Sequence, residues 1–345
     1  MKINLISDTV TKPTSGMFDA MMKAEVGDDM YREDPTTIAL EEKIADMFGM
    51  EAAMFFPSGT MANQTAIKLH TNPGDQLICD KDGHIFHYES GGVSFNSGVS
   101  CRMVDGNRGV ISAEQVEEVI NDPNSFHSPY TSLVSLENTS NKGGGTCYDF
   151  EEILKIKAVC DRHNLKLHLD GARLWNAMVA KNETPQQYGE VFDSISVCLS
   201  KGLGCPVGSV LMGTKEFINR AFRVRKLLGG AMRQIGYVTA AGIYALDNHI
   251  ERLADDHQRA QEISTLLQSF PYVKSVTPVE TNIVIFELDK QVISHLDYIE
   301  LLQEKGISIS TMGPKLRIVT HLDYTAKMHQ YFLETVKNLD ISVSV

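Results

Sequence analysis

One stretch of the chain carries most of the information about its fold: residues 194–204, SISVCLSKGLG. Its first six residues are small or apolar, as in a buried strand, and residues 202–204 form a glycine-rich turn. Lys201 stands between the two, which is unusual because most lysines lie on polar surfaces. A lysine that is desolvated near other cations can act as a nucleophile toward a carbonyl. The alternative is an ordinary loop lysine whose ammonium group reaches solvent.

Short apolar runs of the same kind alternate with amphipathic helical patterns along the chain, which is typical of an α/β protein. We expect strands at residues 53–56, 76–79, 132–136, 165–170, 194–199 and 209–212, the last two within hairpin distance. Ser112 and Gln115 form a capping-box pattern, and Asp149 precedes a helix with acids in its first turn.

The pattern of polar and apolar residues changes near residue 245. We predict a long polar helix from 248 to 269, strands at 282–288 and 316–320, and helices at 296–305 and 327–338. A chain of 345 residues is long enough to need such a subdivision. We therefore predict a large domain at 1–245, with residues 1–14 as an N-terminal arm, and a small C-terminal α+β domain at 246–345.

The composition excludes several classes of protein. The formal net charge of -12 argues against nucleic acid or an anionic membrane surface as the main partner. We find neither a secretory signal nor an apolar run long enough to span a membrane. The six cysteines are scattered without a C-x-x-C pair, so we expect reduced thiols and no metal site. These features predict a cytoplasmic protein.

Two further motifs suit the binding of an anionic, nitrogen-containing ligand. Ser58-Gly59-Thr60 follows a predicted strand and opens a helix, whose free N–H groups and dipole favour a phosphate. Asp170 ends another predicted strand, at the sheet edge where α/β proteins bind ligands. A carboxylate there can keep a pyridine nitrogen protonated. Each motif alone could equally be a helix cap.

Several cations and histidines complete the set of candidates. Lys226 and Arg233 flank paired glycines in a possible anion-binding turn. Arg317 lies in an apolar strand, where a bidentate carboxylate or a structural ion pair would satisfy it. His84 could stack on an aromatic cofactor or act as a base, and His127 could transfer protons.

The order of these motifs along the chain is more specific than any one of them. A phosphate turn, a histidine, an aspartate, a lysine and a carboxylate-binding arginine follow each other as in the aspartate-aminotransferase-like fold of pyridoxal 5'-phosphate enzymes. The chain also resembles the L-threonine aldolase family over nearly its whole length. The segments that carry this resemblance are residues 7–11, 136–139, 168–173, 196–204, 229–234 and 316–321.

The resemblance implies an α/β fold with a mainly parallel sheet, bound pyridoxal phosphate, and a homotetramer with sites at subunit interfaces. It implies that Lys201 forms the Schiff base, Asp170 pairs with the pyridine nitrogen, and His84 stacks on the ring. His84 and His127 would flank the substrate hydroxyl. The other implied ligands divide into a cofactor set, Ser58, Gly59, Thr60, Arg173, Lys226 and Arg233, and a substrate set, Ser7, Tyr31, Arg173 and Arg317, with Glu89 as a further lining residue.

The activity implied by the resemblance is cleavage of L-threonine or L-allo-threonine to glycine and acetaldehyde, within amino-acid metabolism and glycine biosynthesis. A β-eliminating lyase of the same fold, an aminotransferase and a non-catalytic relative are the alternatives. The chain departs from the family pattern at Tyr130, Ser140 and Cys205, where arginine, histidine and alanine are usual. Because of Tyr130, the sequence leaves the substrate range and the stereochemical preference at Cβ undetermined.

Overall fold

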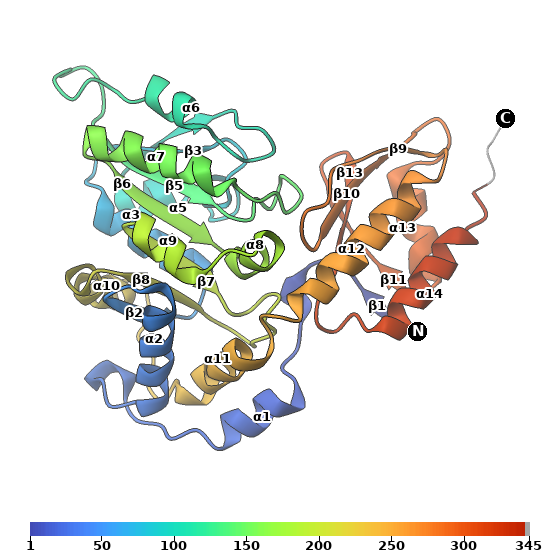
Figure 1. Cartoon of the computed structure of the whole chain (residues 1–345), viewed down its shortest axis with the longest axis horizontal. Helices are drawn as coiled ribbons and strands as arrows, with labels where there is room; N and C mark the ends of the chain where they lie inside the picture. The colour runs from blue at the N-terminus through green and yellow to red at the C-terminus, as the bar shows by residue number, and fades with distance from the viewer. Residues whose placement is uncertain (342–345) are drawn as a thin grey trace.

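The computed structural model describes residues 1–341, which form an α/β unit with a large sheet and a smaller unit beside it (Figure 1). The large sheet has seven strands in the order β2-β8-β7-β6-β5-β3-β4. Six of them point the same way, and β8 runs antiparallel to both of its neighbours. The strands are β2 (Ala52–Phe56), β3 (Gln76–Asp80), β4 (Ser100–Val104), β5 (Thr131–Glu137), β6 (Lys166–Gly171), β7 (Ser194–Cys198) and β8 (Ser209–Gly213).

Helices cover both faces of this sheet, and nearly every residue of its inner strands is therefore buried. One face packs against α2 (Pro35–Phe48), α7 (Phe150–His163), α8 (Leu174–Lys181), α9 (Pro185–Val191) and α11 (Gly236–Asn248). The other face packs against α3 (Gly59–His70), α5 (Gly92–Ser97) and α10 (Lys215–Leu227). The remaining helices of this unit are α1 (Ser15–Met22), α4 (His84–His87) and α6 (Ala113–Glu118), with short 3-10 turns η1 (Asp8–Val10) and η2 (Asp29–Tyr31).

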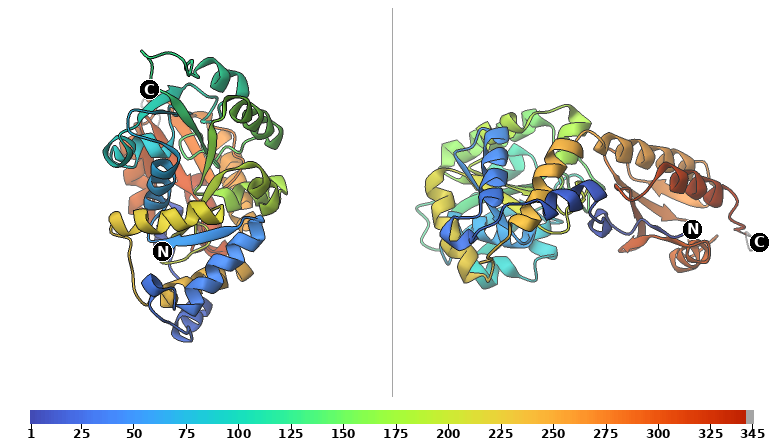
Figure 2. Two further views of the ribbon diagram at one scale, coloured as in Figure 1. Left: turned by 90° about the vertical axis from the view of Figure 1, so that its left-hand side faces the viewer. Right: turned by 90° about the horizontal axis from the view of Figure 1, so that it is seen from below.

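The smaller unit has its own apolar core and a four-stranded antiparallel sheet in the order β12-β13-β10-β9. Its elements are α12 (Leu253–Gln268), β9 (Val273–Val276), β10 (Ile283–Leu288), α13 (His295–Glu304), β11 (Ile307–Ser308), β12 (Ser310–Met312), β13 (Lys315–Val319) and α14 (Ala326–Lys337). The N-terminal strand β1 (Ile3–Asn4) pairs in parallel with β11, so the start of the chain lies beside the smaller unit (Figure 2). The division into residues 1–245 and 246–345 stays a prediction.

The predicted α/β fold class is confirmed, and all eight predicted strands are present. Ser112 and Gln115 make both bonds of a capping box, as predicted. The long helix predicted from residue 248 is wrong at its start, since α11 ends at Asn248 and α12 begins at Leu253. Residues 249–252 form a turn between the two helices, in which the imidazole Nδ1 of the buried His249 lies 2.7 Å from the Leu203 carbonyl oxygen. Across residues 1–341, none of the helices combines the length and apolar character that a membrane span requires.

Candidate active site

Five of the parallel strands deliver the candidate residues to one edge of the large sheet. Strands β2, β3, β5, β6 and β7 end just before, or at, residues 58, 84, 141, 170 and 201. In parallel strands the carboxyl ends meet at a common edge, which is where open α/β sheets bind ligands. The topology therefore gathers segments from five separate parts of the chain.

Lys201 lies in the turn after β7 and is half-buried. Its ammonium group Nζ is 3.3 Å from the thiol sulfur of Cys198. The Thr11 hydroxyl donates to the Lys201 carbonyl oxygen at 3.0 Å, which ties the turn to the N-terminal arm. The lysine is therefore held by a rigid strand on one side and by the arm on the other.

The Ser58-Gly59-Thr60 turn lies against the same cysteine. Ser58 is the N-cap of α3 and accepts a hydrogen bond from the Met61 amide. A Cβ atom added at Gly59 would lie 2.9 Å from Cys198 Sγ and 3.3 Å from Ser209 Oγ. Glycine is required here by the close approach of α3 to β7. One thiol thus contacts both Lys201 and the start of α3.

Asp170 is buried at the end of β6. Its Oδ2 accepts a hydrogen bond from Asn63 Nδ2 at 2.8 Å, and its Oδ1 accepts from the Ala172 amide at 3.1 Å. Asn63 lies one turn into α3 and also accepts from the Ser196 hydroxyl. Helix α3, which begins at the Ser58-Gly59-Thr60 turn, therefore also positions the Asp170 carboxylate.

His84 is fixed at both its backbone and its ring. Its amide donates to Glu137 Oε2 at 2.7 Å, and its Nδ1 lies 3.0 Å from Glu89 Oε1. Ligand atoms of His84, Glu89 and Asp170 lie within 4.8 Å of one another. Burial lowers the pKa of His84, but the Glu89 hydrogen bond and the charge of Asp170 outweigh it and raise the pKa overall.

Glu137 is a half-buried acid whose role could not be predicted from the sequence. It is the cross-strand neighbour of Asp170. Burial and the Asp170 charge raise its pKa to about 7, although its carboxylate accepts from the amides of Asn141 and His84. Its isolated position in the sequence gives no sign that it holds two loops of the site together.

The two arginines differ in their partners. Arg173 is buried and forms a two-point ion pair with Asp8, another residue that sequence reasoning missed. Arg317 donates to the Ile6 carbonyl at 3.3 Å and to Asn141 Oδ1 at 2.9 Å, and its buried Nε has no partner. It lines a hollow of about 640 Å³ together with Ser7, Tyr88 and Ser310.

In the described part of the chain, His127 does not lie near the candidate residues around Lys201. It lies on an exposed loop just before β5 begins, whereas Glu137 and Asp170 lie where β5 and β6 end. The seven residues of β5 separate its two ends by roughly 20 Å.

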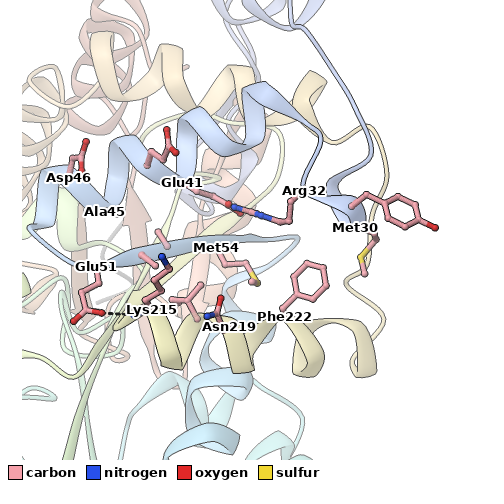
Figure 3. A pocket seen from close by; sticks show the side chains of 15 residues that line it. Met30, Arg32, Glu41, Ala45, Asp46, Glu51, Met54, Lys215, Asn219 and Phe222 are labelled. Carbon is pink, nitrogen blue, oxygen red and sulfur yellow. Dashed lines mark hydrogen bonds and ion pairs between the residues drawn. The ribbon is translucent and has the colours of Figure 1, made fainter.

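Tyr31, Lys226 and Arg233 are also exposed and make no hydrogen bond with Lys201 or residues 58–60 in the described part of the chain. Arg233 instead pairs with Asp28. Tyr31 lines a hollow of about 720 Å³ between α2 and α10, beside the edge strand β2 (Figure 3). None of the residues gathered around Lys201 lines that hollow.

Residues 4–291 match the family described as beta-eliminating lyase. Low-specificity L-threonine aldolase 1 of Arabidopsis thaliana is 41% identical over 339 residues, covering 96% of this chain and 94% of the relative. The Escherichia coli (strain K12) low specificity L-threonine aldolase is 38% identical over 322 residues, covering 93% and 94%. The chain belongs to the L-threonine aldolase family.

The predicted family is therefore confirmed. A solved structure of Leishmania major threonine aldolase superposes with a TM-score of 0.84, covering 97% of this chain and 98% of that one. At 21% identity this likeness supports the fold. A shared fold does not by itself determine the role of each side chain, which depends on the contacts that the side chain makes.

Proposed function

We propose that this protein is a pyridoxal-phosphate enzyme that cleaves L-threonine and related β-hydroxy amino acids to glycine and an aldehyde. One observation carries the proposal. The lysine, the buried aspartate and the glycine-containing start of α3 lie together, linked by the contacts of Cys198 and Asn63. The names of the relatives support threonine as the substrate.

The residues present suit pyridoxal phosphate. The start of α3 offers free amides for a phosphate, and Gly59 leaves space that a side chain would fill. Lys201 offers the amine, and Asp170 a buried carboxylate for the pyridine nitrogen. When bound, the cofactor supplies a ring that accepts the electron pair of the breaking Cα–Cβ bond.

The protein's own contribution is orientation and proton control. Asp170 would keep the proton on the pyridine nitrogen, and Asn63 holds that carboxylate in place. Arg317, with Arg173 and Ser7, would bind the substrate carboxylate and fix the rotation about Cα. His84, held by Glu89, is the histidine of this chain placed to take the proton of the β-hydroxyl, directly or through water.

Residues that lie away from Lys201 support a site shared between subunits. Exposed large apolar side chains accompany them: Phe126 is 89% exposed beside His127, Leu227 is 71% exposed beside Lys226, and Tyr31 is 72% exposed. Contact with a neighbouring subunit would remove the apolar surface of these side chains from water. We therefore propose a homotetramer in which a neighbour supplies Lys226, Arg233, Tyr31 and His127. We also propose a cytoplasmic location.

Product analysis tests the activity. Purified protein with pyridoxal phosphate is given L-threonine and L-allo-threonine separately, and all products are quantified. The proposal predicts acetaldehyde and glycine in equal amounts, and the ratio of the two rates defines the preference at Cβ. Formation of 2-oxobutyrate and ammonia would show an eliminating lyase. A requirement for an α-keto acid would show an aminotransferase.

A further inference from the structure

Asn141 lies where the two arginines of the site meet. Its Oδ1 accepts a hydrogen bond from Arg317 Nη2 at 2.9 Å and one from Arg173 Nη1 at 3.5 Å. Arg317 belongs to β13 of the smaller unit, and Arg173 precedes α8 of the large one. A single amide oxygen therefore links cations from the two parts of the fold.

The charges around this oxygen are unequal. Both Asp8 oxygens are bound to Arg173, which leaves that cation neutralised. Within residues 1–341 the Arg317 guanidinium has no carboxylate partner, and its acceptors are Asn141 and the Ile6 carbonyl. Burial and the Arg173 charge lower the pKa of Arg317 to about 10. Arg317 thus keeps unpaired charge beside the hollow that Ser7 lines.

Asn141 is itself held firmly. Its amide donates to Glu137 Oε1 at 2.9 Å, and the other oxygen of that half-buried carboxylate accepts from the His84 amide. The carboxylate at the end of β5 therefore fixes Asn141 and His84 relative to each other. Through Asn141 it also fixes the direction of Arg317.

We propose that Asn141 is a positioning residue that aims Arg317 at the substrate carboxylate while leaving its charge intact. This inference rests on the proposed function. A neutral acceptor can orient a guanidinium without competing electrostatically for it, whereas a carboxylate in the same place would neutralise it. The choice of asparagine over aspartate then determines how strongly the enzyme prefers a free carboxylate on its substrate.

Two variants separate charge from geometry, and the first of them is isosteric with asparagine. Asn141→Asp keeps the acceptor oxygen and adds a negative charge, and Asn141→Ala removes the acceptor. Asn338→Asp adds the same charge on an exposed residue after α14 and serves as the control. Each protein is assayed with L-threonine and with L-threoninamide, which lacks the carboxylate charge, and its folding is checked by thermal unfolding.

For Asn141→Asp we expect the KM for L-threonine to rise roughly 10- to 100-fold, the size of one charge-assisted hydrogen bond, while kcat changes much less. Its preference for L-threonine over the amide should fall by a similar factor. Asn141→Ala should raise KM less and keep most of that preference. A structural role alone would make Asn141→Ala the more harmful change and leave the preference unaltered.

The outcomes separate the two claims. If the wild type cleaves L-threonine but Asn141→Asp keeps its KM and its preference, the positioning role is wrong and the proposed function stands. If the wild type cleaves neither substrate, the proposed function fails and this role fails with it. A loss confined to kcat in Asn141→Asp would also overturn the positioning role.

Discussion

Asp8 and Arg173 form a buried two-point ion pair, in which Nε donates to Oδ2 and Nη2 donates to Oδ1, each at 2.7 Å. The Asn282 side chain at the start of β10 also donates to Asp8. The pair therefore joins the N-terminal arm, the large unit and the smaller unit at one point next to the site. Its geometry explains why Arg173 is oriented before any substrate arrives.

Replacing one partner of this pair should be costly. Asp8→Asn leaves a buried guanidinium without its counter-charge, and we expect the free energy of unfolding to fall by about 3–5 kcal/mol at pH 7. Urea denaturation measures the loss, with the exposed Asp19→Asn as control. Equal stability of Asp8→Asn and the wild type would show that the pair contributes nothing.

The same pair predicts a pH dependence. Burial alone would raise the pKa of Asp8, but the charge and hydrogen bonds of Arg173 hold it well below its ordinary value. A depressed pKa adds stability above the unfolded-state pKa, and that stability is lost as the pH falls through the folded-state pKa. The difference between wild type and Asp8→Asn should therefore shrink below about pH 4.

His168 should make the fold sensitive to mild acid. It is fully buried between Ser194 and Asn63, and burial lowers its pKa to about 4. Its stabilising contribution is complete above the unfolded-state pKa of about 6.5 and is lost as the pH falls toward 4. At pH 5 the loss is about 2 kcal/mol. Denaturation at pH 7 and pH 5 should show this extra loss in the wild type and the exposed control His87→Gln, but not in His168→Gln.

The contact between Gly59 and Cys198 predicts a steric effect on cofactor binding. Gly59→Ala would force α3 away from β7, since the added Cβ would meet the thiol at 2.9 Å. Overpacking of this kind costs about 1–3 kcal/mol, which lowers cofactor affinity roughly 5- to 150-fold where the strain falls on the bound state. Titration of the apoprotein with pyridoxal phosphate measures the effect. The double variant Gly59→Ala/Cys198→Ala should recover part of it, and tight binding by the single variant would contradict the account.

A shared site predicts complementation between inactive variants. Lys201→Ala and Arg233→Ala each damage a different half of the site if Arg233 acts in a neighbouring subunit. An equal mixture of the two variants, refolded together, should regain roughly a quarter of the wild-type rate. Half of the subunit pairs then contain one copy of each variant, and one of the two sites in such a pair is intact. If Arg233 acts in its own subunit, the mixture gains nothing over the separate variants.

The strands and the residues at their ends could be predicted from sequence because burial and glycine-rich turns leave local patterns. Lys201 and Asp170 are examples, since each lies at or just after the end of a predicted strand. The roles of Asn63, Glu137 and Asn141 could not be predicted, because these residues meet their partners only when α3 and β5 pack beside β6. The exposed strand β4 was missed because it lacks an apolar run. The distance of His127 from the site could have been predicted, because His127 precedes β5 and therefore lies at the opposite edge of the sheet.

The most direct test of the central claim is the yield of acetaldehyde and glycine from L-threonine in the wild type, Lys201→Ala and the exposed-lysine control Lys155→Ala. The account predicts equal amounts of both products from the wild type and from Lys155→Ala. It predicts none from folded Lys201→Ala. Continued cleavage by Lys201→Ala, or the absence of glycine from the wild-type reaction, would contradict it.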